Sequence, residues 1–292
     1  MPKGISTARG RELGEGLTRA LKRADLRGRS AAAIAGWDPS KISNLANGKG
    51  GASTQEVAFL LGACRVQPDE RDHLLALHSD VDARGWWQQH GSYCPIEIRT
   101  LAEHLEIAKS VVTWQNHVVP YALRTPRYMR AVVLASANIP AEEADERAHA
   151  QARARTTGTY YIHESALLLP VGSPDIQAEQ LKLLLDFIDA ADVAGIVIRI
   201  LPVAAGAHAG LNGPFTKLDF EKCEPMVCLE SETSALFVED PAAVKGYDRI
   251  VEALDNCSLD VESSKWAIKR ILATFKGSEP SNIDAGSIET RG

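Results

Sequence analysis

No hydrophobic run in this chain of 292 residues is long enough to cross a bilayer. The longest, residues 196–207, contains Arg199 and Pro202, whereas a membrane-spanning helix needs roughly 20 apolar residues. Residues 1–29 are rich in Lys and Arg and hold no apolar stretch of the kind found in signal peptides. We therefore expect a soluble protein of the cytoplasm.

Cysteine is also scarce, and its five copies are scattered: Cys64, Cys94, Cys223, Cys228 and Cys257. An odd number is not typical of a disulfide framework, and no Cys or His pair has the spacing of zinc ligands. The Gly-x-Ser-x-Gly turn of hydrolases and the phosphate-binding Gly loop are missing as well. We expect buried reduced thiols, no metal and no cofactor.

Acidic residues outnumber basic ones, 38 to 32, but the balance is uneven along the chain. Residues 1–50 hold ten Lys and Arg against four Asp and Glu, a balance of +6 that leaves −12 for the remainder of a chain of net charge −6. A basic head on an acidic body is typical of a small module that binds phosphate, although a solvated basic face gives the same count. The length favours two domains.

Apolar residues recur at helical spacing close to the N-terminus. They form one stripe of an amphipathic helix over residues 11–24. Gly28 interrupts this pattern. Ser30 is expected to cap a short second helix, residues 31–35, which ends at Gly36.

The next segment predicts a third helix with well-defined start signals. Asp38 suits the N-cap, and Pro39 suits the first helical position, where no amide hydrogen is needed. Trp37 and Ile42 have the spacing of a hydrophobic staple. The helix is expected to extend to about Asn47.

Within this third helix, Ile42 and Leu45 point to one side and a polar set points to the other. Asn can pair with adenine, Lys with guanine or phosphate, and Ser with a base or the backbone, so this face suits a major groove. We expect DNA contacts from this face and from two flanking basic residues: Arg29, Ser40, Lys41, Ser43, Asn44, Asn47 and Lys49.

Two further helices complete the N-terminal module. Ser53 and Glu56 have the pattern of a capping box, and a fifth helix begins near Pro68. Five short helices within residues 1–78, with a glycine turn at Gly36, resemble the repressor-type module of phage repressors and Xre regulators. This resemblance implies a helix-turn-helix that binds DNA. A purely structural helical bundle is the alternative.

Residues 79–96 have no clear period and are expected to link this module to a second domain, residues 97–276. One of Trp86 and Trp87 should pack against that second domain. Residues 277–292 are expected to form a disordered tail. The expected fold class is multidomain, with an all-α repressor-type module followed by an α+β regulatory domain.

The second domain mixes helical and strand patterns. A helix is expected to start at Thr125, and other helices are expected at residues 97–112, 141–156, 173–191, 244–254 and 263–275. Strands are expected at residues 160–168, 196–201, 215–220, 226–230 and 235–238.

Several motifs occur in order after the module: Gly85-Trp86-Trp87 and residues 119–125, 162–167, 206–215 and 228–230. With the module, they resemble a group of actinobacterial regulators of development and antibiotic production. The C-terminal half of those proteins is a domain of unknown function described as antitoxin-like. The resemblance implies a DNA-binding regulator, often with a small partner protein encoded beside it. We also expect a homodimer.

Two places in the second domain are candidates for chemistry. His163, Glu164 and Ser165 are adjacent in an expected strand, where neighbours point to opposite faces, so we do not expect them to form a triad. His208 lies in a Gly-rich loop, residues 206–213, after an expected buried strand, where binding residues are often presented.

We expect His208, Asn212 and Glu230 to contact a ligand or partner. The alternative for His208 is a structural role, in which its side chain forms a hydrogen bond within its own loop. Two functions stay open. The first is a transcriptional regulator whose second domain dimerises and binds a small partner protein or effector. The second is a DNA-binding head fused to an enzyme or ligand sensor with a pocket near His208. We favour the first and expect no enzyme, because no paired acid and base or metal set is present.

Overall fold

The structure is a computed structural model that describes residues 6–79, 85–89, 100–101, 104–137, 139–145, 157–191, 195–231 and 234–276. The chain divides into two compact units. The first unit comprises residues 1–113, 156–158 and 208–256, and the second comprises residues 114–155, 159–207 and 257–292. The expected tail and much of the expected linker lie outside the described residues. In the part that is described, no helix is both long and apolar enough to cross a membrane.

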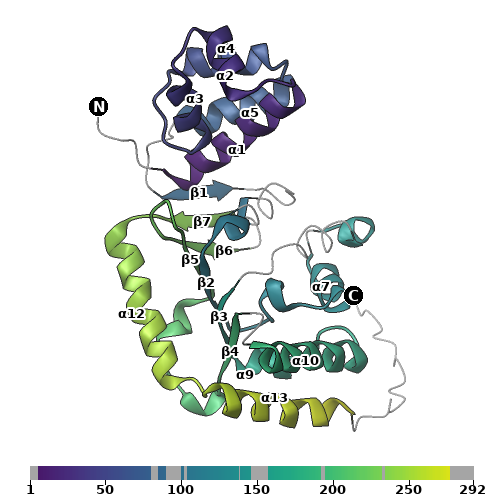
Figure 1. The fold of residues 1–292 in the computed structure, drawn as a ribbon. Helices are drawn as coiled ribbons and strands as arrows, with labels where there is room; N and C mark the ends of the chain where they lie inside the picture. Colours follow the sequence, from purple (N-terminus) through teal and green to yellow (C-terminus); the bar gives the residue numbers. More distant parts are fainter. Residues whose placement is uncertain are drawn as a thin grey trace, which may run out of the picture. The chain divides into compact units, whose positions relative to one another are not determined.

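A group of helices, here called the head, forms the N-terminal part of the first unit (Figure 1). The helices are α1 (Ala8–Arg23), α2 (Gly28–Ala35), α3 (Pro39–Ala46), α4 (Thr54–Ala63) and α5 (Pro68–Ser79). Helix α1 packs against α3 and α5, and α2 packs against α3 and α4. The predicted apolar stripe of α1, which includes Leu13 and Leu17, is buried between them.

Side-chain caps mark the start of α1, α3 and α4, because the first amides of a helix have no partner within it. The Asp38 carboxylate accepts a hydrogen bond from Ser40 N at 2.7 Å, as the sequence predicts. Ser53 and Glu56 form the predicted capping box at the start of α4. Helix α1 begins earlier than predicted because Thr7 serves as its N-cap.

The second helix also begins earlier than the sequence predicts. Helix α2 starts at Gly28 with Arg27 as its N-cap, so the prediction that Ser30 caps it is wrong. Ala31 N donates to Arg27 O at 2.9 Å and closes the first turn. Glycine is tolerated in that turn because its amide needs no partner there, so Gly28 does not interrupt the helix.

Strands form a second part of the first unit. Their order is β1 (Trp86–Gln89), β7 (Ser234–Val238), β6 (Met226–Glu230), β5 (Phe215–Asp219) and β2 (Ser110–Gln115). Neighbours from β1 to β5 pair antiparallel, with Trp86 opposite Phe237 and Cys228 opposite Thr216. Trp86 is buried and stacks on Phe237, with 5.5 Å between ring centroids, whereas Trp87 is 63% exposed. One tryptophan of the pair therefore packs, as expected.

The predicted helix over residues 97–112 is wrong at its C-terminal end. Residues 104–107 are helical, but Ser110–Gln115 form strand β2. Val111 and Thr113 are buried while Val112 between them is half-buried, which is the alternation of a strand. These β-branched residues favour the sheet over the helical spacing once neighbouring strands are available. Residues 97–99 and 102–103 lie outside the described residues.

In the second unit the strand order is β2, β3 (Gly158–His163) and β4 (Ile196–Leu201), since β2 contributes residues to both units. Helices α10 (Pro174–Asp189) and α13 (Val261–Lys276) pack on each other and on β4. Helix α7 (Pro126–Leu134) has Thr125 as its N-cap, and α10 has Ser173 as its N-cap, both as predicted. Aliphatic and tyrosine side chains of these elements form a continuous core.

The remaining elements are short or peripheral. They are α9 (Glu164–Leu168), α12 (Pro241–Cys257), and the 3-10 helices η1 (Tyr121–Leu123), η2 (Ala141–Glu143), η3 (Val203–Ala205) and η4 (Ala209–Asn212). The predicted strand over residues 160–168 is wrong beyond His163, because the His163 side chain caps the helix that follows. Of the predicted helix over residues 141–156, only residues 141–145 are described, and they begin with η2.

The arrangement confirms the expected multidomain fold class. An all-α head comes first, and a region of mixed helices and strands follows it.

Candidate nucleic-acid interface

A tight turn joins helices α2 and α3. Gly36 has a φ of +67°, in the left-handed region that favours glycine, and its amide donates to Ala33 O at 3.3 Å. Trp37 N donates to Ala32 O at 2.8 Å, which closes the end of α2. Ala32 is fully buried, and its small side chain lets the two helices approach closely. This is the predicted helix-turn-helix geometry.

Helix α1 holds α3 from behind through two glycines. A Cβ on Gly14 would lie 2.4 Å from Ala46 O, and one on Gly10 would lie 2.4 Å from Gly48 O. Since atoms do not approach so closely, any larger residue would push α1 away from the end of α3. Our sequence reasoning missed this contact, although glycines four apart on one helix face are a signal for close backbone packing.

The front of α3 is polar and accessible. Ser40, Ser43 and Asn44 are exposed, whereas Ile42 and Leu45 are buried beneath them. The Asn44 side chain makes no hydrogen bond within the described part of the chain, so both its donor and its acceptor are available. The predicted division of this helix into an apolar back and a polar front is therefore correct.

Two residues of the expected set are engaged by neighbours. Lys41 Nζ donates to Glu56 Oε1 at 2.6 Å and lies 4.7 Å from the centroid of the Trp37 ring. The hydrogen bond from Lys41 is the main cause that lowers the pKa of Glu56. Asn47 Nδ2 donates to Ser43 O at 2.6 Å, which ties the end of α3 to its last turn. Lys41 keeps two further N–H donors and Asn47 keeps its amide oxygen, so each can contact DNA without giving up these partners.

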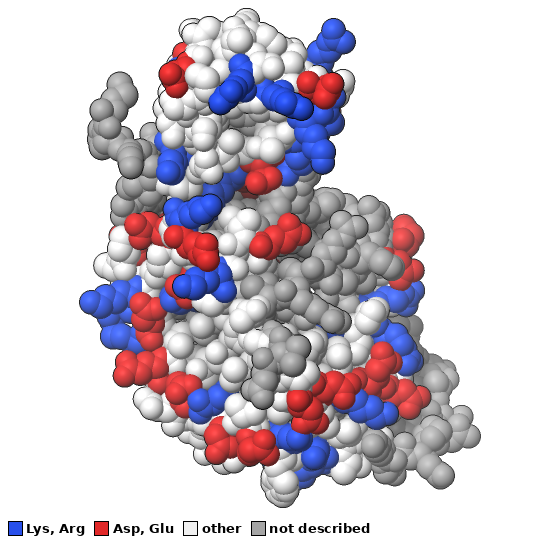
Figure 2. Space-filling view, in the orientation of Figure 1, with Lys and Arg blue, Asp and Glu red and all other residues white. Residues whose placement is uncertain are grey.

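The two flanking basic residues lie in different surroundings. Arg29 lines a groove between α1, α2 and α3, together with Lys22, Arg27 and Ser43. Lys49 follows α3 and lines a separate cavity. On the face of the head visible in Figure 2, Lys and Arg side chains gather with few acidic ones between them. This surface can attract a polyanion.

The expected ligand contacts of the second domain serve their own loop or lie at the surface. His208 caps η4, and its Nδ1 accepts a hydrogen bond from Gly210 N at 3.1 Å. Partial burial lowers the pKa of His208. Asn212 and Glu230 are exposed. A cavity beside α12 is lined by Ala209 and not by His208.

The expectation that residues 163–165 lie in one strand is wrong, because β3 ends at His163 and α9 begins at Glu164. His163 Nδ1 accepts a hydrogen bond from Ser165 N at 3.2 Å and lies 2.6 Å from Ser165 Oγ. Ser165 Oγ also donates to Asn116 O at 2.8 Å. Glu164 is bound elsewhere, to Val203 N and Arg270. These are the contacts of a helix cap, and the carboxylate does not orient the imidazole.

Potential metal ligands and cysteine thiols are the remaining candidates for chemistry in the described part of the chain. Within it, no group of three or more His, Cys, Asp or Glu side chains is placed to hold a metal ion. Cys64 and Cys228 are buried free thiols, and burial raises the pKa of each.

Two family models match the chain, and the boundary between them does not coincide with the boundary between the two compact units. Residues 12–74 match the model of a helix-turn-helix domain. Residues 98–270, more than half of the chain, match a domain of unknown function, DUF5753. The chain belongs to the DUF5753 family. No curated protein and no solved structure matches it.

This DUF5753 protein therefore carries a helix-turn-helix DNA-binding domain at its N-terminus, and α3 is the helix that follows its turn. Side chains from both parts of the sequence meet inside the first unit. Glu239 Oε1 accepts a hydrogen bond from Ala8 N at 2.7 Å and lies 3.4 Å from Arg11 Nη2, and both charged side chains are buried. Our sequence reasoning missed this pair, since 228 positions separate the two residues.

Proposed function

We propose that the chain is a sequence-specific transcriptional regulator that binds double-stranded operator DNA through α3. The observation that carries the proposal is the exposed polar front of this helix, Ser40, Ser43 and Asn44, within a matched helix-turn-helix domain. A short helix held firmly from behind fits a major groove about 12 Å wide.

Asn44 is the principal base-reading residue in this proposal. Its amide offers one acceptor and two donors, which match the N6 and N7 edge of adenine. Lys41 contributes less, because Glu56 takes one of its three donors and offsets its charge. Ser40 and Ser43 contact a base or the sugar-phosphate backbone.

Residues beside α3 hold the helix in register on the duplex. Arg29 and Lys49 contact phosphates, and Asn47 supports the end of α3. Such contacts add affinity without reading sequence, and each neutralised phosphate contributes about 0.9 to the slope of log affinity against log salt.

We further propose that the DUF5753 region forms a homodimer and binds a small partner protein or effector through His208, Asn212 and Glu230. Two considerations support this. The ordered motifs of the region resemble actinobacterial Xre-type regulators with an antitoxin-like C-terminal half. A single short helix reads few base pairs, and a two-fold dimer doubles the number. The cytoplasm is the compartment in which such a regulator acts.

The proposal is tested by in vitro selection of duplexes bound by the full chain, followed by affinity measurements on the selected sequence. Asn44→Ala should weaken binding by about tenfold to a hundredfold, because one bidentate base contact is lost. The melting temperature should stay within about 1–2 °C, since Asn44 is exposed. Asn256→Ala, an exposed asparagine on α12, is the matched control and should bind normally.

An unchanged affinity for Asn44→Ala would contradict the assignment of α3 as the reading helix. The dimer has its own readout, which is the symmetry of the selected sequence together with the sedimentation of the complex. A single chain on a site without two-fold symmetry would contradict the dimer.

A further inference from the structure

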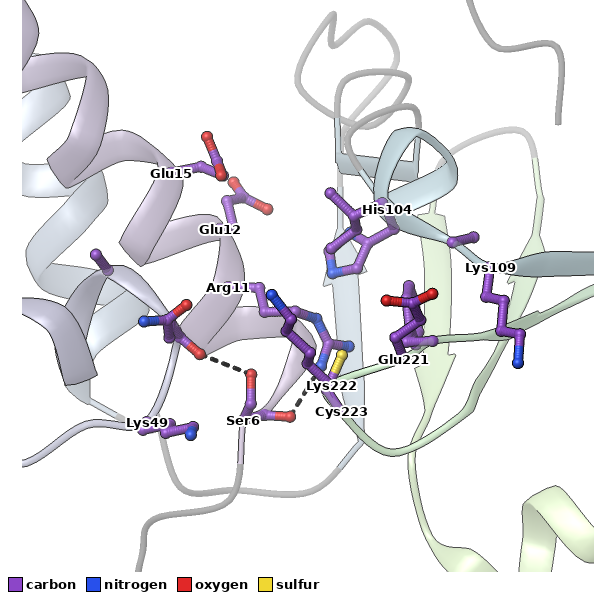
Figure 3. Close-up of a pocket in the computed structure, with 15 residues that line it drawn as sticks. Ser6, Arg11, Glu12, Glu15, Lys49, His104, Lys109, Glu221, Lys222 and Cys223 are labelled. Atoms are coloured by element: carbon purple, nitrogen blue, oxygen red, sulfur yellow. Dashed lines mark hydrogen bonds between the residues drawn. The ribbon is translucent and has the colours of Figure 1, made fainter.

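A cavity of about 760 Å³ lies within the first unit (Figure 3). It is lined by side chains of α1, the end of α3, residues 104–109 and residues 220–223. Its volume falls within the roughly 300–1,000 Å³ of small-molecule sites. The cavity is distinct from the His208 loop, where the sequence predicts a ligand or partner contact.

A buried cation forms part of the wall. Arg11 Nη1 donates to Ser6 O at 2.8 Å, and the guanidinium lies 5.1 Å from the Phe220 ring centroid. Arg11 Nη2 reaches Glu239 at 3.4 Å, while its Nε has no hydrogen-bond partner in the described part of the chain. A buried donor without a partner is costly, so a bound group that accepts a hydrogen bond there is favoured.

His104 presents the complementary group. It is 2% exposed, and its Nδ1 donates to Thr100 O at 2.6 Å. Burial first, and the charge of Arg11 second, lower the pKa of His104 to about 3, so the ring is neutral. Nε2 is then a bare acceptor, and it has no partner among the described residues. A ligand that fits this position carries a hydroxyl or N–H group.

The rim adds positive charge from three separate segments. Lys49, Lys109 and Lys222 line the cavity, and none of the three has an ion pair in the described part of the chain. Three carboxylates line it as well. Glu12 is held by Thr100 at 2.6 Å and His73 at 3.1 Å, and Glu15 and Glu221 are exposed, so the four basic side chains of the lining outnumber them by one. The apolar lining comes from Ile107, Ala108 and Phe220.

We propose that this cavity binds a small, partly aromatic organic anion that carries a hydroxyl or N–H donor. The donor meets His104 Nε2, the anionic group meets the rim lysines and Arg11, and the ring packs on the apolar lining. This combination of charge, donor and apolar surface defines the class of ligand.

The position of the cavity makes it a regulatory site, a consequence that rests on the proposed function. Ala46, Asn47 and Lys49 at the end of the recognition helix line the cavity, and Ser6 Oγ donates to Asn47 O at 2.8 Å. A ligand that contacts these residues changes the free energy of α3 in its DNA-binding position. Ligand binding and operator binding must then influence each other by the same factor.

The first experiment titrates the full chain with anilinonaphthalene sulfonate, a fluorescent aromatic anion with one N–H group. We expect saturable binding of one probe per chain, displaced by salicylate, which combines a carboxylate with a hydroxyl donor. Benzoate lacks the donor and salicylamide lacks the charge, so each should displace the probe about tenfold less well. Equal displacement by all three compounds would overturn the proposed ligand class.

Two variants locate the probe. Lys222→Glu reverses an exposed rim charge and should weaken probe binding by about tenfold, whereas Lys245→Glu on α12 is the matched control and should bind normally. His104→Phe removes the acceptor and should abolish the preference for salicylate over benzoate. Equal binding by the two lysine variants would overturn the site, because the probe would then lie elsewhere.

Regulation is tested on the DNA sequence selected by the full chain. Saturating salicylate should change operator affinity at least fivefold, and Lys222→Glu should remove most of that change. If the probe binds but salicylate leaves the operator affinity unchanged, the regulatory role is overturned and the binding site is not. Probe binding by a chain that selects no DNA would instead contradict the proposed function and leave the cavity assignment standing.

Discussion

The two units of the chain bury different kinds of polar side chain. Among the described residues, every buried Asp, Glu, His, Lys or Arg side chain (Arg11, Glu12, His78, His104 and Glu239) belongs to the first unit. The second unit buries neutral ones: Thr125, Gln177, Gln180 and Ser264. Both units have an apolar core, but only the unit that contains the DNA-binding head also has to compensate buried charges of these types.

The buried amides of the second unit are internal connectors. Gln180 Nε2 donates to Leu123 O at 2.7 Å, and its Oε1 accepts from Thr125 N at 2.8 Å. A neutral group satisfied in this way costs little and does not respond to pH. Buried charges are costly unless they have partners. Their concentration around the cavity of the first unit therefore indicates a region that serves binding more than stability.

The largest expected effect is the loss of the buried carboxylate of the first unit. Glu239→Ala leaves Arg11 without its charge partner and Ala8 N without its acceptor. We expect the free energy of unfolding to fall by about 3–5 kcal/mol, as measured by urea denaturation of the full chain.

Glu179→Ala supplies the matched control in the second unit. Glu179 forms an exposed ion pair with Arg127 at 2.8 Å, and its removal should cost less than about 1 kcal/mol. Similar losses for the two variants would mean that burial does not distinguish these pairs, and the comparison between the units would fail.

A core substitution examines the second unit directly. Leu184 is fully buried in its apolar core, so Leu184→Ala should cost about 2–5 kcal/mol through lost burial and the cavity left behind. The loss should be the same at pH 7 and at pH 5, because the side chain does not titrate. Urea denaturation at both pH values measures it, and a loss that depends on pH would contradict an uncharged interior.

A smaller effect is expected from acid in the first unit. The pKa of His104 is about 3 in the folded chain and about 6.5 when exposed, so the unfolded state binds the proton more tightly. The stability that the neutral ring contributes is complete above pH 6.5 and is lost as the pH falls towards 3. The loss should amount to about 2 kcal/mol between pH 7 and pH 5.

His104→Asn isolates this contribution, because the asparagine amide nitrogen takes the place of Nδ1 and can still donate to Thr100 O but cannot titrate. The difference in unfolding free energy between the parent chain and His104→Asn should shrink by that amount over the same pH range. A difference that stays constant with pH would mean that His104 is accessible to protons in the folded chain.

Local chemistry made several elements predictable. Asp38 with Pro39 and Ser173 with Pro174 combine a cap with a residue suited to the first helical turn, and α3 and α10 begin there. Where two local signals compete, the sequence misled us. Residues 110–112 fit a helical spacing as well as a strand, and hydrogen bonding to neighbouring strands decided in favour of β2.

The sequence by itself determined the helix-turn-helix and the polar front of α3, because caps, a glycine turn and helical spacing act within a few residues of one another. Only the tertiary structure decided which charges are buried together. Arg11 and Glu239 are far apart in the chain, and His104 becomes a neutral acceptor only because other segments remove it from water. Burial is a property of the packed chain, and no local pattern reports it.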